Sequence, residues 1–272
     1  MILYVYLILG CIAGIIVPFA ADLIGSVADA WKIILLIAAF TLGLVVLHLV
    51  AAVIMCLFID KNKEPKTLKN IHRPIAISTL DAFLRVAGIS IKVTGMEKLP
   101  DEPFMLVCNH RSLLDAIAAI VAFRKYYVSF VSKKENIKIP VISRYMVQLG
   151  CLFLDREDTR SAVKTINRAA EMIKSGMGSV AICPEGTRNT TDELLLPFHA
   201  GSYKIAQKAK CPVVVFSIWG TDEVKKHPVI KRTNVYIDVV DVISADKVQE
   251  LRSNELADMT RETLLHNLER YI

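Results

Sequence analysis

A histidine and an aspartate five positions apart, His110 and Asp115, are the residues whose types and spacing point most directly to chemistry. A carboxylate that hydrogen-bonds one imidazole nitrogen fixes the tautomer, so that the other nitrogen can remove a proton from a hydroxyl group. On a continuous helix, five residues correspond to a rotation of about 140°, and the two side chains would diverge. We therefore expect His110 in a turn and Asp115 in the first turn of the helix that follows. A serine nucleophile is not needed if the substrate supplies the hydroxyl group.

The pair alone does not establish a catalytic site. With six histidines in the chain, an aspartate five positions after one of them arises by chance in roughly one such chain in four. The alternative for His110 is a structural histidine whose nitrogens are satisfied within the fold. Asn109, directly before it, is expected to hold the turn through side-chain hydrogen bonds and to lie beside the substrate.

A second polar segment, Cys183-Pro-Glu-Gly-Thr-Arg188, follows another short apolar run. Its proline and glycine predict a sharp loop. The alternative is an ordinary surface turn with an exposed ion pair. If the loop belongs to the site, the residues expected to contact substrate are Glu185, Gly186, Thr187 and Arg188.

In a third segment, Gly150-Cys-Leu-Phe-Leu-Asp-Arg156, an apolar run is also followed directly by charged residues. The planar guanidinium group of Arg156 could bind a phosphate through two parallel hydrogen bonds (bidentate binding), or it could be a solvated surface charge. If the three preceding runs are parallel strands, all three polar segments meet at one edge of a sheet. Ligands bind at that edge in open α/β sheets.

Apolar, β-branched runs alternate with helix-like segments after residue 100. Such runs predict strands buried on both faces, at residues 104–108, 127–131, 151–154, 179–183, 213–218 and 234–240. Apolar spacing predicts helices at residues 113–123, 158–174 and 202–209, and one helix or a pair at 246–271. The alternation predicts a three-layer α/β domain with a mostly parallel or mixed central sheet.

Two long runs without charged side chains, residues 1–21 and 33–58, precede this domain. At about 1.5 Å per residue, each run could cross a hydrocarbon core of roughly 30 Å. We therefore predict a two-helix membrane anchor, rather than buried core helices or a signal peptide, since the first run lacks a basic start. A spanning hairpin and a re-entrant pair both satisfy the pattern.

Charge is distributed unevenly along the chain. Residues 1–60 hold three aspartates and one lysine, so the net charge of +6 leaves +8 for the rest. Four lysines at positions 61, 63, 66 and 69 follow the second apolar run and predict that the polar part lies on the cytoplasmic side. Such a basic domain is expected to meet anionic headgroups or phosphorylated substrates. Nucleic acid is not expected as a partner, because there is no arginine-rich run.

Two features of the remaining sequence favour ordinary structural roles. Residues 71–88 have the spacing of an amphipathic helix, and their few positive charges favour packing on the domain over a position at the membrane surface. The six cysteines form no C-x-x-C pair and flank apolar runs. They indicate reduced, buried thiols rather than a disulfide framework or a zinc site.

The three polar segments occur in the order and rough spacing of a known family. The sequences of residues 109–115, 150–156 and 184–188 resemble the first three conserved blocks of the glycerolipid acyltransferases. Residues 88–95 and 198–201 resemble the same family. The resemblance covers about residues 88–240.

The resemblance implies transfer of a fatty acyl group from acyl-CoA or acyl carrier protein to lysophosphatidic acid, giving phosphatidic acid. In this reaction His110 would deprotonate the acceptor hydroxyl, Asp115 would orient His110, and Arg156 and the loop 185–188 would hold the glycerol phosphate. No metal or other cofactor is implied. The chain would then divide into a membrane anchor (1–60), a basic connector with an amphipathic helix (61–87) and a catalytic domain (88–272).

Two positions depart from the family pattern. Val215 replaces a proline of the fourth block, and His199 replaces a common lysine. Both positions are expected on the acceptor or acyl side, so another lyso-lipid, such as a lysophospholipid or an aminolipid, is an alternative acceptor. An alternative of another class is a non-catalytic, membrane-tethered lipid-binding protein, against which the intact His110 and Asp115 argue.

Overall fold

The computed structural model describes residues 2–21, 29–226 and 232–272, and their core is a seven-stranded sheet. The strands are β1 (Ile89–Thr94), β2 (Met105–Val107), β3 (Ser129–Lys133), β4 (Leu152–Leu154), β5 (Val180–Ile182), β6 (Val213–Trp219) and β7 (Thr233–Ile243). Their order across the sheet is β1-β7-β6-β2-β5-β3-β4. The non-consecutive order means that helices must cross over the sheet between strands.

Five neighbouring strands, β6, β2, β5, β3 and β4, run parallel. β7 pairs antiparallel with β6, and β1 pairs parallel with β7 at one edge. The predicted mostly parallel or mixed sheet is therefore confirmed. Because the five parallel strands share one direction, the loops after all of them emerge at the same edge of the sheet.

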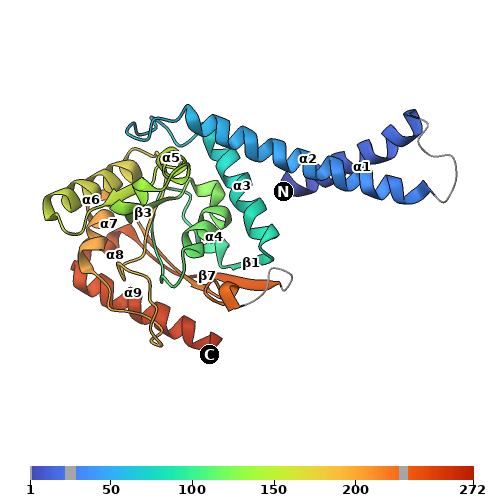
Figure 1. Ribbon diagram of the computed structural model, residues 1–272. Coiled ribbons are helices and arrows are strands. Elements are labelled where there is room, and N and C mark those ends of the chain that lie inside the picture. Colours follow the sequence, from blue (N-terminus) through green and yellow to red (C-terminus); the bar gives the residue numbers. More distant parts are fainter. Residues whose placement is uncertain (1, 22–28, 227–231) are drawn as a thin grey trace.

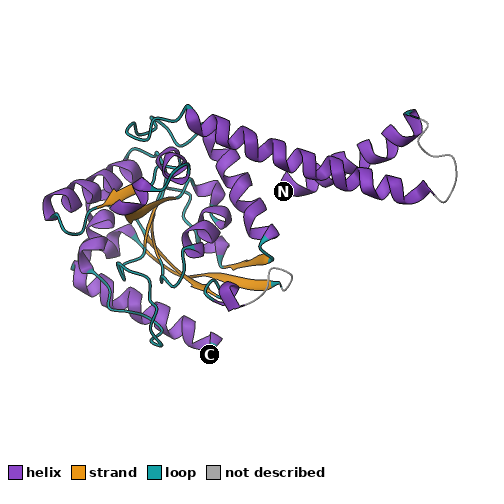
Figure 2. Cartoon of the chain, in the orientation of Figure 1, coloured by secondary structure: helices purple, strands orange, loops and turns teal. Residues whose placement is uncertain are grey.

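Helices cover both faces of the sheet, as the three-layer prediction requires (Figures 1 and 2). The face with α3 (His72–Val86) and α4 (Leu114–Ala122) buries one apolar cluster, with α5 (Ile142–Gln148) alongside α3. The opposite face carries α6 (Thr159–Lys174), α7 (Lys204–Ala209), α8 (Ala245–Glu250) and α9 (Ser253–Leu268). α3 contributes Ala76 and Leu84 to the core, which is the packing favoured for this segment.

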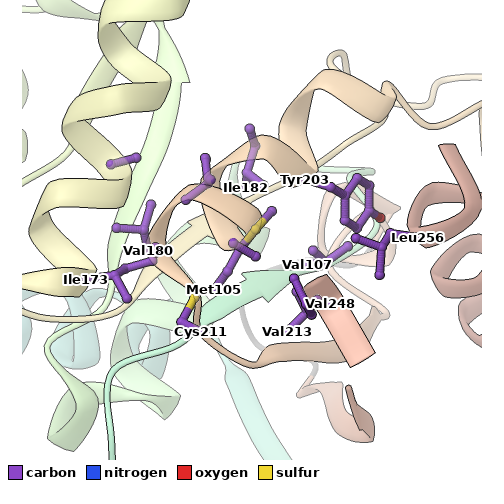
Figure 3. Packing of buried hydrophobic residues seen from close by; sticks show 14 of the residues in the cluster. Met105, Val107, Ile173, Val180, Ile182, Tyr203, Cys211, Val213, Val248 and Leu256 are labelled. Atoms are coloured by element: carbon purple, nitrogen blue, oxygen red, sulfur yellow. The ribbon is translucent and has the colours of Figure 1, made fainter. Parts of the chain in front are cut away.

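A second apolar cluster lies between the sheet and the helices α6 to α9, and it shows why alternate strand residues are apolar (Figure 3). Met105 and Val107 of β2, Val180 and Ile182 of β5, and Val213 of β6 all point to this face. They meet helix side chains that Figure 3 labels, Ile173, Tyr203, Val248 and Leu256. Burying both faces of the short strands removes them from water and fixes their register, and therefore fixes where each strand ends.

Short 3-10 helices connect the larger elements. They are η2 (Met96–Lys98), η3 (Arg124–Tyr126), η4 (Lys134–Lys138), η5 (Ala200–Tyr203), η6 (Glu223–Lys226) and η7 (Glu269–Tyr271).

Two apolar helices, α1 (Ile2–Ala20) and α2 (Ala30–Leu57), form a hairpin that projects from the domain (Figure 1). Within it, Gly10 and Gly14 lie so close to α2 that a Cβ atom at either would collide with Thr41 or Ile37. Both helices are long and apolar enough to cross a membrane, with mean hydropathies of 2.5 and 2.8. Part of the polar connector, including Asp22, lies outside the described residues.

The hairpin is joined to the domain by polar contacts as well as by packing. His48 of α2 hydrogen-bonds Tyr6 of α1 through Nδ1 (2.9 Å) and Thr79 of α3 through Nε2 (2.8 Å). At the far end of α2, Arg144 of α5 donates to three backbone carbonyls, of which that of Ile59 is nearest at 2.8 Å. The two apolar helices therefore have a defined attachment to α3 and α5.

Candidate active site

His110 lies in the loop between β2 and α4, and Asp115 lies in the first turn of α4, as the spacing predicts. Nδ1 of His110 is 2.9 Å from Oδ2 of Asp115. Because a carboxylate accepts, Nδ1 carries the hydrogen and Nε2 is left as the base. The His110 side chain is 22% exposed and that of Asp115 only 1%. The imidazole can therefore meet a substrate, while its partner is shielded from water.

The Asp115 carboxylate is held by donors on both oxygens. Oδ2 also accepts from the backbone N–H groups of Arg111 (2.7 Å) and Ser112 (2.8 Å). Oδ1 accepts from the hydroxyl of Thr221 (2.5 Å), which belongs to the loop after β6. Four hydrogen bonds offset the cost of burying this polar group and fix its orientation toward His110.

The backbone of His110 is held on both sides by the loop after β5. Its N–H donates to Oε1 of Glu185 (2.6 Å), and its carbonyl accepts from the N–H of Asn189 (2.6 Å). The second oxygen of Glu185 accepts from the N–H of Leu196 (2.9 Å). Glu185 is 3% exposed and both of its oxygens are engaged. With both oxygens bonded to backbone N–H groups, Glu185 joins the loop after β2 to the loop after β5.

The surroundings of His110 shift its acid–base behaviour. Burial by itself lowers the pKa of an imidazole, but the hydrogen bond to Asp115 and the nearby Cys183, Asp115 and Glu185 raise the pKa of His110 above its ordinary value. Burial raises the pKa of Glu185, against the effect of its two backbone hydrogen bonds. An imidazole with a raised pKa is a stronger base toward a hydroxyl group.

Asn109 holds its loop through side-chain hydrogen bonds, as the sequence predicts. Its side chain is fully buried, and it exchanges two hydrogen bonds of 2.8 Å with the backbone N–H and carbonyl of Ile218 in β6. These two bonds connect the residue that follows β2 to the backbone of β6, and so fix the start of the His110 loop.

A cationic surface lies beside this centre. Arg156 and Arg188 are both exposed, and among the described residues neither guanidinium group has a hydrogen-bond or ion-pair partner. Gly186 of the loop after β5 has a positive φ of +72° and lies against this surface. A Cβ atom at this position would lie 2.9 Å from Nε2 of His199 and 3.8 Å from Cζ of Arg156. A larger residue would displace the His199 ring. Thr187 is exposed in the same loop.

The structure separates the two positions that depart from the expected pattern. His199 adjoins Gly186 and Arg156, so it belongs to the cationic surface. Val215 is fully buried in the middle of β6, where its partner is Asp241 at an irregularity of the β6–β7 pairing. Its side chain belongs to the core cluster on the face with α6 and α9, so it is not part of the cationic surface.

Several supporting residues are absent from the sequence-based prediction. Thr221 and Asn189 hold Asp115 and His110, and Arg111 donates to Asp222 (2.8 Å) and to the carbonyl of Glu193 (3.1 Å). Thr221 and Asp222 follow the apolar run of β6, the same strand-end signal that selected the other site residues. Across the described chain, no group of three or more His, Cys, Asp or Glu side chains could hold a metal ion.

Comparisons with known proteins show that the sequence is similar to acyltransferases. A family model described as "Acyltransferase" matches residues 90–219. The 1-acyl-sn-glycerol-3-phosphate acyltransferase of Saccharomyces cerevisiae is 30% identical over 185 residues, which are 66% of this chain and 60% of that protein. A probable 1-acyl-sn-glycerol-3-phosphate acyltransferase of Mycoplasma genitalium is 26% identical over 253 residues, covering 85% of this chain and 91% of the relative.

A solved structure shares both sequence and fold. The crystal structure of the 1-acyl-sn-glycerophosphate (LPA) acyltransferase of Thermotoga maritima is 29% identical, with a TM-score of 0.58, and the match covers 74% of this chain and 81% of that one. Residues 90–219 therefore match an acyltransferase domain, and the predicted resemblance of the chain to the glycerolipid acyltransferases is confirmed by these relatives and by the solved structure.

Proposed function

We propose that this protein transfers a fatty acyl group from the thioester of acyl-CoA or acyl carrier protein to the free hydroxyl of lysophosphatidic acid, giving phosphatidic acid. The observation that carries the proposal is a partly exposed His110, oriented by a buried Asp115, at a sheet edge that also presents arginines without a partner among the described residues. A base for a hydroxyl and a cationic surface for a phosphate are the two groups this acceptor requires.

The reaction begins at Nε2 of His110, which takes the proton from the acceptor hydroxyl as its oxygen attacks the thioester carbonyl carbon. Asp115 keeps Nδ1 protonated and stabilises the imidazolium that forms. Collapse of the tetrahedral intermediate breaks the carbon–sulfur bond. The imidazolium then returns the proton to the departing thiolate, so the products are an ester and a free thiol, and His110 is neutral again.

The acceptor phosphate would be bound by Arg156 and Arg188, with Gly186 and Thr187 lining the loop between them. Arginine forms short, charge-assisted hydrogen bonds to phosphate oxygens. An exposed arginine without a protein partner keeps its donors available for such a ligand. Asn109 and Glu185 would act indirectly, by holding the loops that carry the catalytic and binding groups.

The membrane is the proposed location of the reaction. α1 and α2 have the length and hydropathy of an anchor, and their apolar side chains are exposed, for example Ile34 at 71%. The lysines after α2 favour a cytoplasmic catalytic domain. In this arrangement the lyso-lipid, the product and the acyl tail remain in or beside the bilayer.

Another lyso-lipid remains the alternative acceptor, since His199 lies at the cationic surface in place of the common lysine. The test is an assay of the full chain in vesicles with acyl-CoA and acyl carrier protein as donors. The acceptors are lysophosphatidic acid, lysophosphatidylcholine, lysophosphatidylethanolamine and an aminolipid. We expect the highest kcat/KM with lysophosphatidic acid. If it is the poorest acceptor, the proposed substrate is wrong, and if no donor is consumed with any acceptor, the lipid-binding alternative holds.

A further inference from the structure

The end of β6 and the turn after it, residues 218–222, contact the His110 loop at three separate points. Asn109 pairs with the backbone of Ile218, Asp115 accepts from Thr221, and Arg111 donates to Asp222. These contacts link parts of the chain that are more than 100 residues apart. The three contacts place Thr221 at the centre of the junction, directly against the carboxylate.

Thr221 has a contact that no other described residue supplies. Oδ2 of Asp115 accepts hydrogen bonds from His110 and from the backbone N–H groups of Arg111 and Ser112. Oδ1 accepts its hydrogen bond from the Thr221 hydroxyl. The residues Thr221 and Asp115 are 1% and 0% exposed, so water does not readily take over this bond. A carboxylate held on one oxygen can still rotate about its Cβ–Cγ bond. A donor on the second oxygen stops that rotation.

We propose that Thr221 is a positioning residue for the acyl-transfer reaction: its hydroxyl fixes the rotation of the Asp115 carboxylate and so aims Nε2 of His110 at the acceptor hydroxyl. This inference rests on the proposed role of His110 as the base. Its effect is expected on the chemical step rather than on acceptor binding, because Thr221 faces Asp115 and not the cationic surface around Arg156.

The charged groups around His110 give the proposal a second measurable consequence, a change in the pH dependence of the reaction. The groups that act on His110 are Asp115, Glu185 and Cys183, and the Arg111–Asp222 pair lies beside them. A hydroxyl that donates to Asp115 disperses part of its negative charge. Without that hydroxyl, Asp115 would hold the imidazolium more strongly, and His110 would lose its proton at a higher pH.

The experiment compares Thr221→Val, which keeps the shape but removes the hydroxyl, with Thr221→Ser, which keeps the hydroxyl. Both are assayed as full chains in vesicles for kcat, acceptor KM and the pH dependence of kcat/KM. Glu223→Gln is the matched control, because it removes an exposed ion pair with Lys226 in η6, which directly follows this segment. His110→Ala is measured alongside, and circular dichroism with thermal melting verifies the fold of each variant.

We expect Thr221→Val to lower kcat about 10- to 100-fold, the range for loss of a hydrogen bond to a charged group. Acceptor KM should stay within about twofold, the acid limb should move to higher pH, and Thr221→Ser should restore most of kcat. The proposal is overturned if Thr221→Val keeps the kcat and pH profile of the parent, if only KM changes, or if Thr221→Ser is equally impaired. Should Thr221→Val not fold, Thr221→Ala replaces it with the same criteria.

The control with His110 separates this inference from the proposed function. If His110→Ala is inactive and Thr221→Val behaves like the parent, only the role of Thr221 is refuted. If His110→Ala retains the activity of the parent, the proposed mechanism itself fails.

Discussion

The proposed mechanism gives His110 and Asp115 different tasks, and the two side chains differ in exposure. The proposed base has to reach a substrate hydroxyl, and its side chain is 22% exposed; the carboxylate that orients it is 1% exposed. Shielding from water strengthens the hydrogen bonds that hold Asp115, so the pair is oriented before substrate binds. The same low exposure requires that every oxygen of Asp115 has a donor, which the two backbone N–H groups and Thr221 provide.

The raised pKa of His110 makes a prediction at the residue scale. His110 must be neutral to accept a proton, so activity falls as pH decreases through its pKa. Because Asp115 and the nearby Cys183 and Glu185 outweigh burial, that pKa lies above the ordinary value of about 6.5. We expect the acid limb of a kcat/KM profile for acyl transfer to have its midpoint above about 6.5. A midpoint below that value would contradict the assignment of the base.

Arg156 should affect binding of the acceptor more than the chemical step. Replacing Arg156 with alanine removes charge-assisted hydrogen bonds to phosphate that exist in the ground state and the transition state alike. We expect acceptor KM to rise about 10- to 100-fold with kcat nearly unchanged. The measurement is steady-state kinetics with varied lysophosphatidic acid. Arg160→Ala, an exposed arginine in the first turn of α6, is the control, and an unchanged KM for Arg156→Ala would exclude Arg156 as a phosphate contact.

At the scale of elements, the site depends on where strands end. β2, β5, β4 and β6 are parallel within the sheet, so the loops that carry His110, Glu185, Arg156 and Thr221 open at one edge. The first turn of α4 then brings Asp115 back toward that edge. Each loop is short or is held by hydrogen bonds to its neighbour, so the rigid sheet determines the spacing of the reacting groups.

α6 follows the Arg156 loop and offers a test of element stability. Asp158 caps its first turn: its carboxylate accepts from the N–H groups of Arg160 (2.9 Å) and Ser161 (3.1 Å). We expect Asp158→Ala to lower the free energy of unfolding by about 1 kcal/mol. Thermal melting checks this, and Glu157→Ala is the control, since its side chain makes no capping bond. Equal melting temperatures for both variants would show that the cap does not stabilise α6.

The elements that sequence patterns predict are those with buried apolar runs or clear helical spacing. All six predicted strands and the helices around α4 and α6 are present within a few residues of the expected bounds. β1 is missing from the prediction even though Ile89–Thr94 alternates apolar and polar residues, which is the sequence pattern of a half-buried strand; in the structure this edge strand becomes more exposed from Ile89 to Thr94. α5 is missing because it is short and follows Val141, whose positive φ of 62° has no local sequence signal.

Strand direction and residue roles were harder to predict, because both depend on distant partners. The antiparallel β7 is set by its pairing with β6, and the fully buried Asn109 is set by the backbone of Ile218. Residue type suggested a polar contact with substrate for Asn109 and Glu185. Their hydrogen bonds instead go to backbone groups that only the folded chain brings near.

For the whole molecule, the hairpin and the domain are connected by specific contacts. Tyr6, His48 and Thr79 form a chain of hydrogen bonds from α1 through α2 to α3, and Arg144 holds the end of α2. The catalytic edge therefore has a defined position relative to the apolar helices. This connection is consistent with a domain that is held at a bilayer rather than tethered by a loose linker.

Membrane attachment and orientation can be measured together. We expect the full chain to stay with membranes after an alkaline carbonate wash, because α1 and α2 expose apolar side chains along most of their length. Trypsin should cut the lysine-rich connector, residues 61–69, in sealed vesicles whose cytoplasmic face is outward. Vesicles of the opposite orientation are the control. Release by carbonate would contradict the anchor, and cleavage confined to the opposite vesicles would reverse the proposed orientation.

The most direct test of the central claim is acyl transfer by the His110→Ala full chain in vesicles with saturating lysophosphatidic acid and acyl donor. We expect kcat to fall at least about 10³-fold, because no other described group occupies the position of the base. Acceptor binding should be retained, since Arg156 and Arg188 are untouched. Acyl transfer at the parent rate by a folded His110→Ala protein would contradict the account.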